Sequence, residues 1–175
     1  MSISLKVIGI TKDKQFLLLA IVFAFLVLNA TAHGKEIPFD FNHCWSLKFT
    51  GEIVKADELS INNFELLGIV TSNTDDKMFD NISSHCINFL VRTGNGIDLP
   101  GYCKYMAPDE SYYVSQASCD SSGCSWKIIY GTGTFKGASG GASSFSTYTQ
   151  AQPISAGTSQ GCSRHVGTIT LPDTQ

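Results

Sequence analysis

The sequence has few charged residues and lacks the common catalytic motifs. Charged residues make up 15% of its 175 residues, and the formal net charge is −3. A chain without excess positive charge lacks the electrostatic footprint of nucleic-acid binding, so no nucleic-acid partner is expected. Neither a G-x-S-x-G nucleophile elbow nor an H-E-x-x-H zinc motif occurs. These absences favour a protein that is not an enzyme.

The longest apolar run is also too short to cross a membrane. It covers 13 residues, from Phe16 to Leu28, whereas a membrane-spanning helix needs about 20. Three lysines precede the run, and Ala30-Thr31-Ala32 follows it. A basic segment, a short apolar segment and small residues at a cleavage position are typical of a secretory signal. The sequence therefore predicts a cleaved signal helix within residues 1–32, a periplasmic or secreted location, and no membrane association after cleavage.

Six cysteines follow the predicted signal: Cys44, Cys86, Cys103, Cys119, Cys124 and Cys162. An even number of cysteines in an exported chain indicates disulfides. The four residues between Cys119 and Cys124 favour a turn, so these two cysteines are expected to face each other across a hairpin. Cys86 and Cys103 flank Gly94-Asn95-Gly96 at similar distances, which predicts a second bridge. The remaining pair, Cys44 with Cys162, would join the first and last segments of the domain.

A metal site is the alternative use of these cysteines. His43 precedes Cys44, His85 precedes Cys86, and His165 follows Cys162 closely. Mixed sulfur and nitrogen ligands suit zinc or copper. However, no C-x-x-C pair is present, and neighbouring residues on a strand point to opposite faces. Disulfides are therefore expected, with no metal and no other cofactor.

Short runs of β-branched and aromatic residues alternate with turn-forming clusters in the rest of the chain. Trp45, Leu47 and Phe49 alternate with polar neighbours, which is the pattern of a strand with one apolar face. Helical periodicity is weak, so the expected fold class is all-β. The predicted strands cover residues 44–54, 63–71, 84–92, 97–106, 111–118, 125–130, 142–149 and 163–171. Closing these antiparallel strands into an eight-stranded barrel would leave no exposed edge.

The expected organisation after the signal is a single domain. Residues 33–43 are expected to be a short lead-in, residues 44–172 the barrel, and residues 173–175 a tail. Residues 73–81 form the longest polar connection between predicted strands, and a solvated loop is expected there.

Two glycine-rich segments near the C-terminus carry a family resemblance. Residues 126–141 contain the text G-T-G-T-F-K-G, and residues 161–172 begin with G-C and end with L-P. Together with Cys44-Trp45, they resemble a group of small exported bacterial proteins of unassigned function. A shorter set of positions is similar to the allene oxide cyclase and dirigent barrels: Gly131, Gly133, Phe135, Ala138 and Gly140. That similarity implies an eight-stranded barrel of the calycin or allene oxide cyclase type.

A small eight-stranded barrel has an interior wide enough for side chains or for one small ligand. Aromatic residues are the candidates for the lining of such a site: Trp45, Phe49, Phe89, Trp126, Tyr130 and Phe135. The favoured function is therefore the binding of a small apolar ligand by an exported barrel. Two alternatives stay open. One is an isomerase or cyclase, which the barrel resemblance implies; the other is a secreted interaction protein whose aromatic residues only fill the core.

Overall fold

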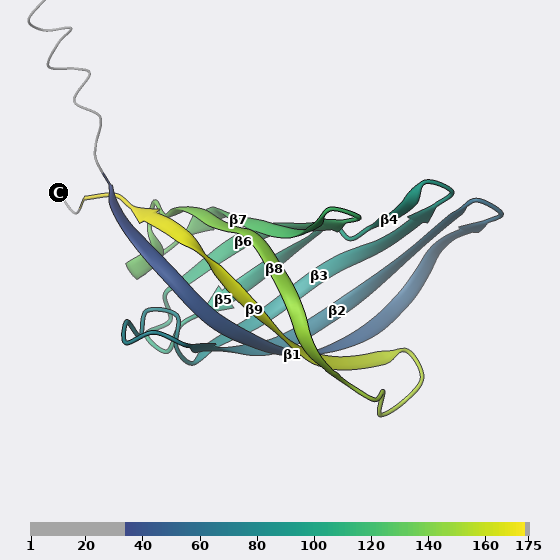
Figure 1. Ribbon diagram of the computed structural model, residues 1–175, viewed down its shortest axis with the longest axis horizontal. Helices are drawn as coiled ribbons and strands as arrows, with labels where there is room; N and C mark the ends of the chain where they lie inside the picture. Colours follow the sequence, from purple (N-terminus) through teal and green to yellow (C-terminus); the bar gives the residue numbers. More distant parts are fainter. Residues whose placement is uncertain (1–33, 174–175) are drawn as a thin grey trace, which may run out of the picture. The chain divides into compact units, whose positions relative to one another are not determined.

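The computed structural model describes residues 34–173, which form nine β-strands and one short 3-10 turn (Figure 1). The elements are β1 (Lys35–Ala56), β2 (Leu59–Ser72), β3 (Ile82–Thr93), β4 (Gly96–Asp98), β5 (Gly101–Met106), β6 (Tyr112–Asp120), β7 (Gly123–Gly131), η1 (Gly133–Phe135), β8 (Ser139–Ala151) and β9 (Thr158–Leu171). The predicted signal helix within residues 1–32 lies outside the described residues.

Eight of the strands close into an antiparallel ring. The order is β2-β1-β9-β8-β7-β6-β5-β3, and a further pairing between β2 and β3 completes the circle. The short strand β4 folds back on β3 and extends the ring by one hairpin. The predicted all-β fold with eight antiparallel strands is confirmed, but the ring is not a regular barrel. Bulges interrupt several pairings, and β7 pairs with β8 at only three positions.

Each predicted strand overlaps an observed strand, with two differences. The predicted strand at residues 97–106 is divided into β4 and β5, because Pro100 has no backbone N–H to donate to a ladder. Strand β1 begins at Lys35, so most of the expected lead-in belongs to the sheet. Within it, Ile37 and Phe39 are buried, which shows that the apolar alternation starts well before Cys44.

The three disulfides join residues that face each other on neighbouring strands. Cys44–Cys162 connects β1 to β9, Cys86–Cys103 connects β3 to β5, and Cys119–Cys124 connects β6 to β7. The turn positions predict two of these bridges, and Cys44–Cys162 is the pair that was expected to remain. Strands β1 and β9, the first and last of the chain, lie side by side in Figure 1. The Cys44–Cys162 bridge therefore links the first strand covalently to the last.

One end of the ring is filled by an aromatic plug, which we define as the buried side chains of Phe39, Phe41, Phe79, Tyr113 and Phe135. Phe79 comes from the β2–β3 connection, which was expected to be only a solvated loop. Its ring centroid lies 5.1 Å from that of Phe39 and 5.9 Å from that of Phe135. Phe135 belongs to η1, and its ring lies 4.9 Å from that of Tyr113. The interior of the ring is therefore packed at this end.

Candidate functional site

The other half of the ring contains a partly open cavity of about 260 Å³. Inward-facing side chains from all eight ring strands form its wall. The aromatic members are Trp45, Phe64, Tyr105, Trp126 and Phe145, and the aliphatic ones are Leu47, Leu66, Leu99 and Ala117. The disulfides Cys86–Cys103 and Cys119–Cys124 also face the cavity. A concave, mostly apolar wall with a few polar groups is characteristic of small-molecule sites.

Two of the six predicted lining residues, Trp45 and Trp126, line this cavity. Phe135 is buried in the aromatic plug instead. The other three are not part of the wall, and their exposed fractions are 40% for Phe49, 36% for Phe89 and 56% for Tyr130.

Strand geometry explains these differences. Phe89 lies three residues from Cys86 on β3, so the two side chains point to opposite faces, and Cys86 points inward. Tyr130 lies on the same face as Trp126 only if β7 is regular. A bulge places Tyr130 opposite Val114 and Ile128 opposite Ser115, which turns Tyr130 outward.

Phe49 lies beside a second irregularity. The pairing of β1 with β2 shifts between Phe49 and Gly51, beyond the last β1 residue of the cavity wall, Leu47. The Phe49 ring packs edge-on against Phe64, with 5.7 Å between ring centroids. Phe49 therefore supports a wall residue from the rim and does not itself face the cavity.

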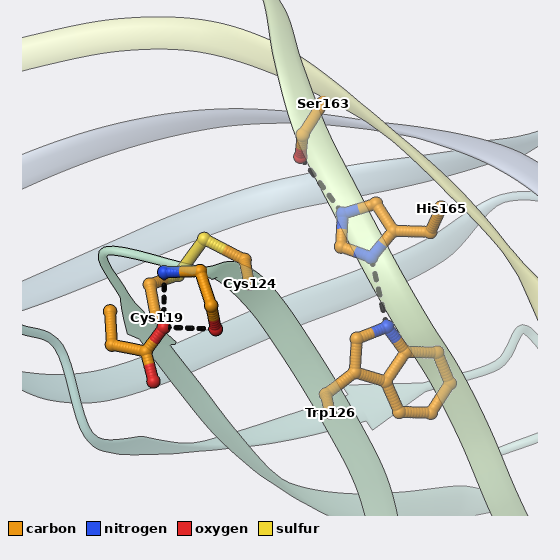
Figure 2. Close-up of a disulfide and its surroundings, with 7 residues drawn as sticks. Cys119, Cys124, Trp126, Ser163 and His165 are labelled. Carbon is orange, nitrogen blue, oxygen red and sulfur yellow. Dashed lines mark hydrogen bonds between the residues drawn. A yellow bond between two sulfur atoms is a disulfide. The ribbon is translucent and has the colours of Figure 1, made fainter.

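A chain of hydrogen bonds joins Trp126, His165 and Ser163, which all line the cavity (Figure 2). The ring of His165 also stacks on that of Phe41 in the aromatic plug, with 5.0 Å between ring centroids. The indole Nε1 of Trp126 donates to Nδ1 of His165 at 2.9 Å, and Nε2 of His165 lies 2.8 Å from Oγ of Ser163. An indole nitrogen only donates, so Nδ1 of His165 carries no proton and Nε2 carries one. Nε2 of His165 therefore donates to Ser163, whose hydroxyl lies 3.5 Å from the backbone carbonyl oxygen of His43.

His43 is fixed by a separate contact on the same level. Its Nε2 lies 2.7 Å from Oγ of Ser84, and both residues are buried. Strand β2 makes room for this contact with Gly68. A Cβ atom at that position would lie 2.5 Å from Nε2 of His43 and 2.9 Å from Oγ of Ser84. A glycine is therefore required where the imidazole crosses the neighbouring strand.

Both imidazoles are neutral at pH 7. Burial lowers the pKa of His43 to about 4. Burial, together with the charge that His43 would carry, lowers the pKa of His165 to about 3. The described residues that line the cavity include no lysine, arginine, aspartate or glutamate. The wall therefore offers no full charge to a ligand.

This arrangement does not activate a nucleophile at the cavity. A serine nucleophile needs a base that accepts its proton, whereas His165 donates to Ser163. Ser84 pairs with His43 but is buried outside the cavity wall. The hydrogen-bonded side chains of His43, Ser163 and His165 instead fix the shape of one side of the cavity, which we call the cavity floor.

The cysteines that lie close to histidines in the sequence are all in disulfides. Within residues 34–173, no group of three His, Cys, Asp or Glu side chains is arranged to hold a metal ion. In the same part of the chain, no helix is long and apolar enough to span a membrane.

No model of a known protein family, no curated protein and no solved structure matches this chain. The resemblances noted in the glycine-rich segments therefore stay predictions.

Sequence reasoning missed Leu66 and Asn88, and it considered His43 and His165 only as possible metal ligands. A signal for Asn88 was present, because it lies two residues from Cys86 and so shares the inward face of β3. The contact between Trp126 and His165 had no such signal, since the two residues lie 39 positions apart on strands that do not pair.

Proposed function

We propose that this protein is an exported binding protein that holds one small, largely apolar molecule inside its ring of strands. The observation that carries the proposal is the cavity of about 260 Å³, walled mainly by aromatic, aliphatic and disulfide side chains. Paired strands carry most of its wall, and the disulfide Cys86–Cys103 joins two of them, β3 and β5, on the side that faces the cavity. The site is therefore formed before a ligand arrives.

The cavity volume sets the size of the ligand. An apolar cavity of about 150 Å³ holds benzene, so a cavity of this size suits a molecule of roughly ten non-hydrogen atoms. The three disulfides support a location outside the cytoplasm, because disulfides persist in oxidising compartments. The signal features within residues 1–32 support the same location, periplasmic or secreted.

Intrinsic fluorescence tests the proposal directly. Trp45 and Trp126 are the two tryptophans of the chain, and both line the cavity. n-Butylbenzene, which has ten carbon atoms, is expected to change their emission saturably. Mass spectrometry of the native protein, purified from its own host, would also detect a retained molecule.

A matched pair of variants separates binding in the cavity from binding elsewhere. Ala117 points into the cavity, and its neighbour Ser118 is exposed on the outer face. Ala117→Leu is expected to weaken binding of n-butylbenzene at least tenfold, whereas Ser118→Leu should leave it unchanged. Absence of binding to the wild-type protein, together with no retained molecule, would overturn the proposal. Equal binding by both variants would place the ligand outside the cavity and overturn it as well.

A further inference from the structure

Asn88 is the residue of the cavity wall whose side chain has the most unused hydrogen-bonding capacity. It is 8% exposed and lines the cavity from β3. No hydrogen bond joins its side-chain amide to another residue within 34–173, and the amide is not among the polar groups sealed inside the protein. The amide nitrogen and oxygen of Asn88 therefore border the cavity.

The position of this amide is fixed by the strand beside it. Asn88 faces Gly101 of β5 in the sheet register. A Cβ atom at position 101 would lie 1.7 Å from Oδ1 of Asn88, so the amide lies across the backbone at a place that only glycine leaves open. The Cys86–Cys103 disulfide bridges the same two strands two residues away. The amide is therefore held in place without a hydrogen bond of its own.

The other buried polar groups of the wall are less available. His43, Ser163 and His165 take part in the hydrogen bonds of the cavity floor. Tyr105 also borders the cavity, but its hydroxyl offers one donor and an acceptor, whereas the amide of Asn88 offers two donors and an acceptor. A purely apolar ligand would cover this amide without bonding to it, which is unfavourable, so a ligand that bonds to the amide gains affinity.

The absence of charged side chains from the wall limits which polar group a bound ligand can carry. The wall has no charged side chain, and both of its histidines are neutral at pH 7. A carboxylate or an ammonium group would be buried there without a counter-charge, which is strongly unfavourable. Burying a neutral polar group avoids the free-energy penalty of an unpaired charge.

We infer that the ligand is a neutral molecule with an apolar body and one hydroxyl, carbonyl or carboxamide group, and that this group bonds to the side-chain amide of Asn88. The inference rests on the proposed binding function and gives it a chemical class. The apolar body fills the space between Trp45, Leu66 and Trp126, and the polar group sets the direction in which the molecule lies.

Three probes of similar size test this class: n-butylbenzene, 3-phenyl-1-propanol and 3-phenylpropanoate. The wild-type protein is expected to bind the alcohol at least as tightly as the hydrocarbon, and the carboxylate at least tenfold more weakly than the alcohol at pH 7. Asn88→Leu should weaken alcohol binding about tenfold, the effect of one hydrogen bond, and leave hydrocarbon binding unchanged or tighter. Gln116→Leu is the matched control, because Gln116 carries the same kind of amide on the outer face of β6, outside the cavity, so it should leave the binding of all three probes unchanged.

The outcomes separate this inference from the proposed function. If no probe binds the wild-type protein, the binding function itself fails. If hydrocarbon and alcohol bind but Asn88→Leu changes neither, or if Tyr105→Phe alone weakens the alcohol, the role of Asn88 is wrong and the binding function stands. Binding of the carboxylate as tightly as the alcohol would also overturn the inference. Should Asn88→Leu not fold, the Asn88 side-chain amide resonances of the wild-type protein decide, because they should shift with the alcohol and not with the hydrocarbon.

Discussion

The indole N–H of Trp126 on β7 donates to Nδ1 of His165 on β9, although these strands are not neighbours in the ring. Strand β8 lies between them and pairs with β7 at only three positions. The hydrogen bond crosses the interior beside the ladder of the ring that has the fewest paired residues. It therefore ties together two strands that the backbone ladder connects only indirectly.

The tautomer of His165 is the first prediction. Because an indole nitrogen only donates, Nδ1 of His165 must be unprotonated, and the ring proton must lie on Nε2. Two-bond ¹H–¹⁵N correlation spectra at pH 7 should show the Nε2–H tautomer. Trp126→Phe removes the donor and should leave the ring free to change tautomer. An Nδ1–H tautomer in the wild-type protein would contradict the hydrogen bond.

The pH dependence of stability is the second prediction. The folded state holds the pKa of His43 at about 4 and that of His165 at about 3, both below the ordinary value of 6.5. Below pH 6.5 the unfolded chain therefore binds more protons than the folded one. The free energy of unfolding should fall as the pH decreases from about 6.5 towards 4, by about 1.4 kcal/mol per pH unit for each histidine. Urea unfolding between pH 4.5 and 8 measures this slope, which should vanish above pH 7.5.

A variant pair tests the assignment of that slope. His165→Gln removes one titrating ring, so its slope should be about half that of the wild-type protein, whereas Ile82→Val should lower stability equally at every pH. Carboxylates change the free energy of unfolding only at lower pH. Hydrogen bonding to Arg164 lowers the pKa of Asp40, so the stability that Asp40 contributes is lost only below about pH 4. An unchanged slope in His165→Gln would show that other groups cause the effect.

Two glycine substitutions form the third prediction. An alanine at Gly68 would place its Cβ 2.5 Å from Nε2 of His43, which must then move away from Ser84. Gly68→Ala should therefore reduce the free energy of unfolding by about 2 kcal/mol or more. Gly94→Ala is the matched control, because nothing lies within 4 Å of a Cβ at that position. Equal effects in urea unfolding would show that the contact with His43 is not tightly packed.

The fourth prediction compares two disulfides. Cys44–Cys162 spans a sequence separation of 118, and Cys119–Cys124 spans 5. In the loop-entropy description, removing the first should cost about 5 kcal/mol and removing the second about 2 kcal/mol. Double serine variants, Cys44→Ser with Cys162→Ser and Cys119→Ser with Cys124→Ser, should therefore differ clearly in melting temperature. Similar losses would indicate that local packing, and not loop closure, determines the effect.

The strands and two of the disulfide pairs could be predicted because they depend on local patterns, and Cys44–Cys162 then followed as the remaining pair. Alternating residues such as Trp45 and Leu47 mark a half-buried strand, and a short turn between Cys119 and Cys124 brings the two together. The face on which a residue lies was harder to predict. A bulge of one residue in β7 was enough to turn Tyr130 outward, and nothing in the local sequence marks that bulge.

The candidate site depended on contacts between distant parts of the chain. Phe79 lies in a segment rich in aspartate and asparagine, whose composition predicts solvent exposure, yet its ring completes the aromatic plug. The position of the cavity follows from this plug, because the plug determines which half of the ring is filled. To predict where the plug and the cavity lie, the register of all eight strands must be known, and hydrophobic alternation does not specify that register.

The division of the ring into a packed half and a hollow half also affects how the binding specificity of such a protein can change during evolution. Some wall residues, such as Leu47 and Thr147, belong to the hollow half and are not part of the hydrophobic core that contains the aromatic plug. Substitutions at these positions alter the outline of the cavity while the packed half keeps the chain folded. One scaffold is thereby open to selection for differently shaped ligands, with little loss of stability along the way.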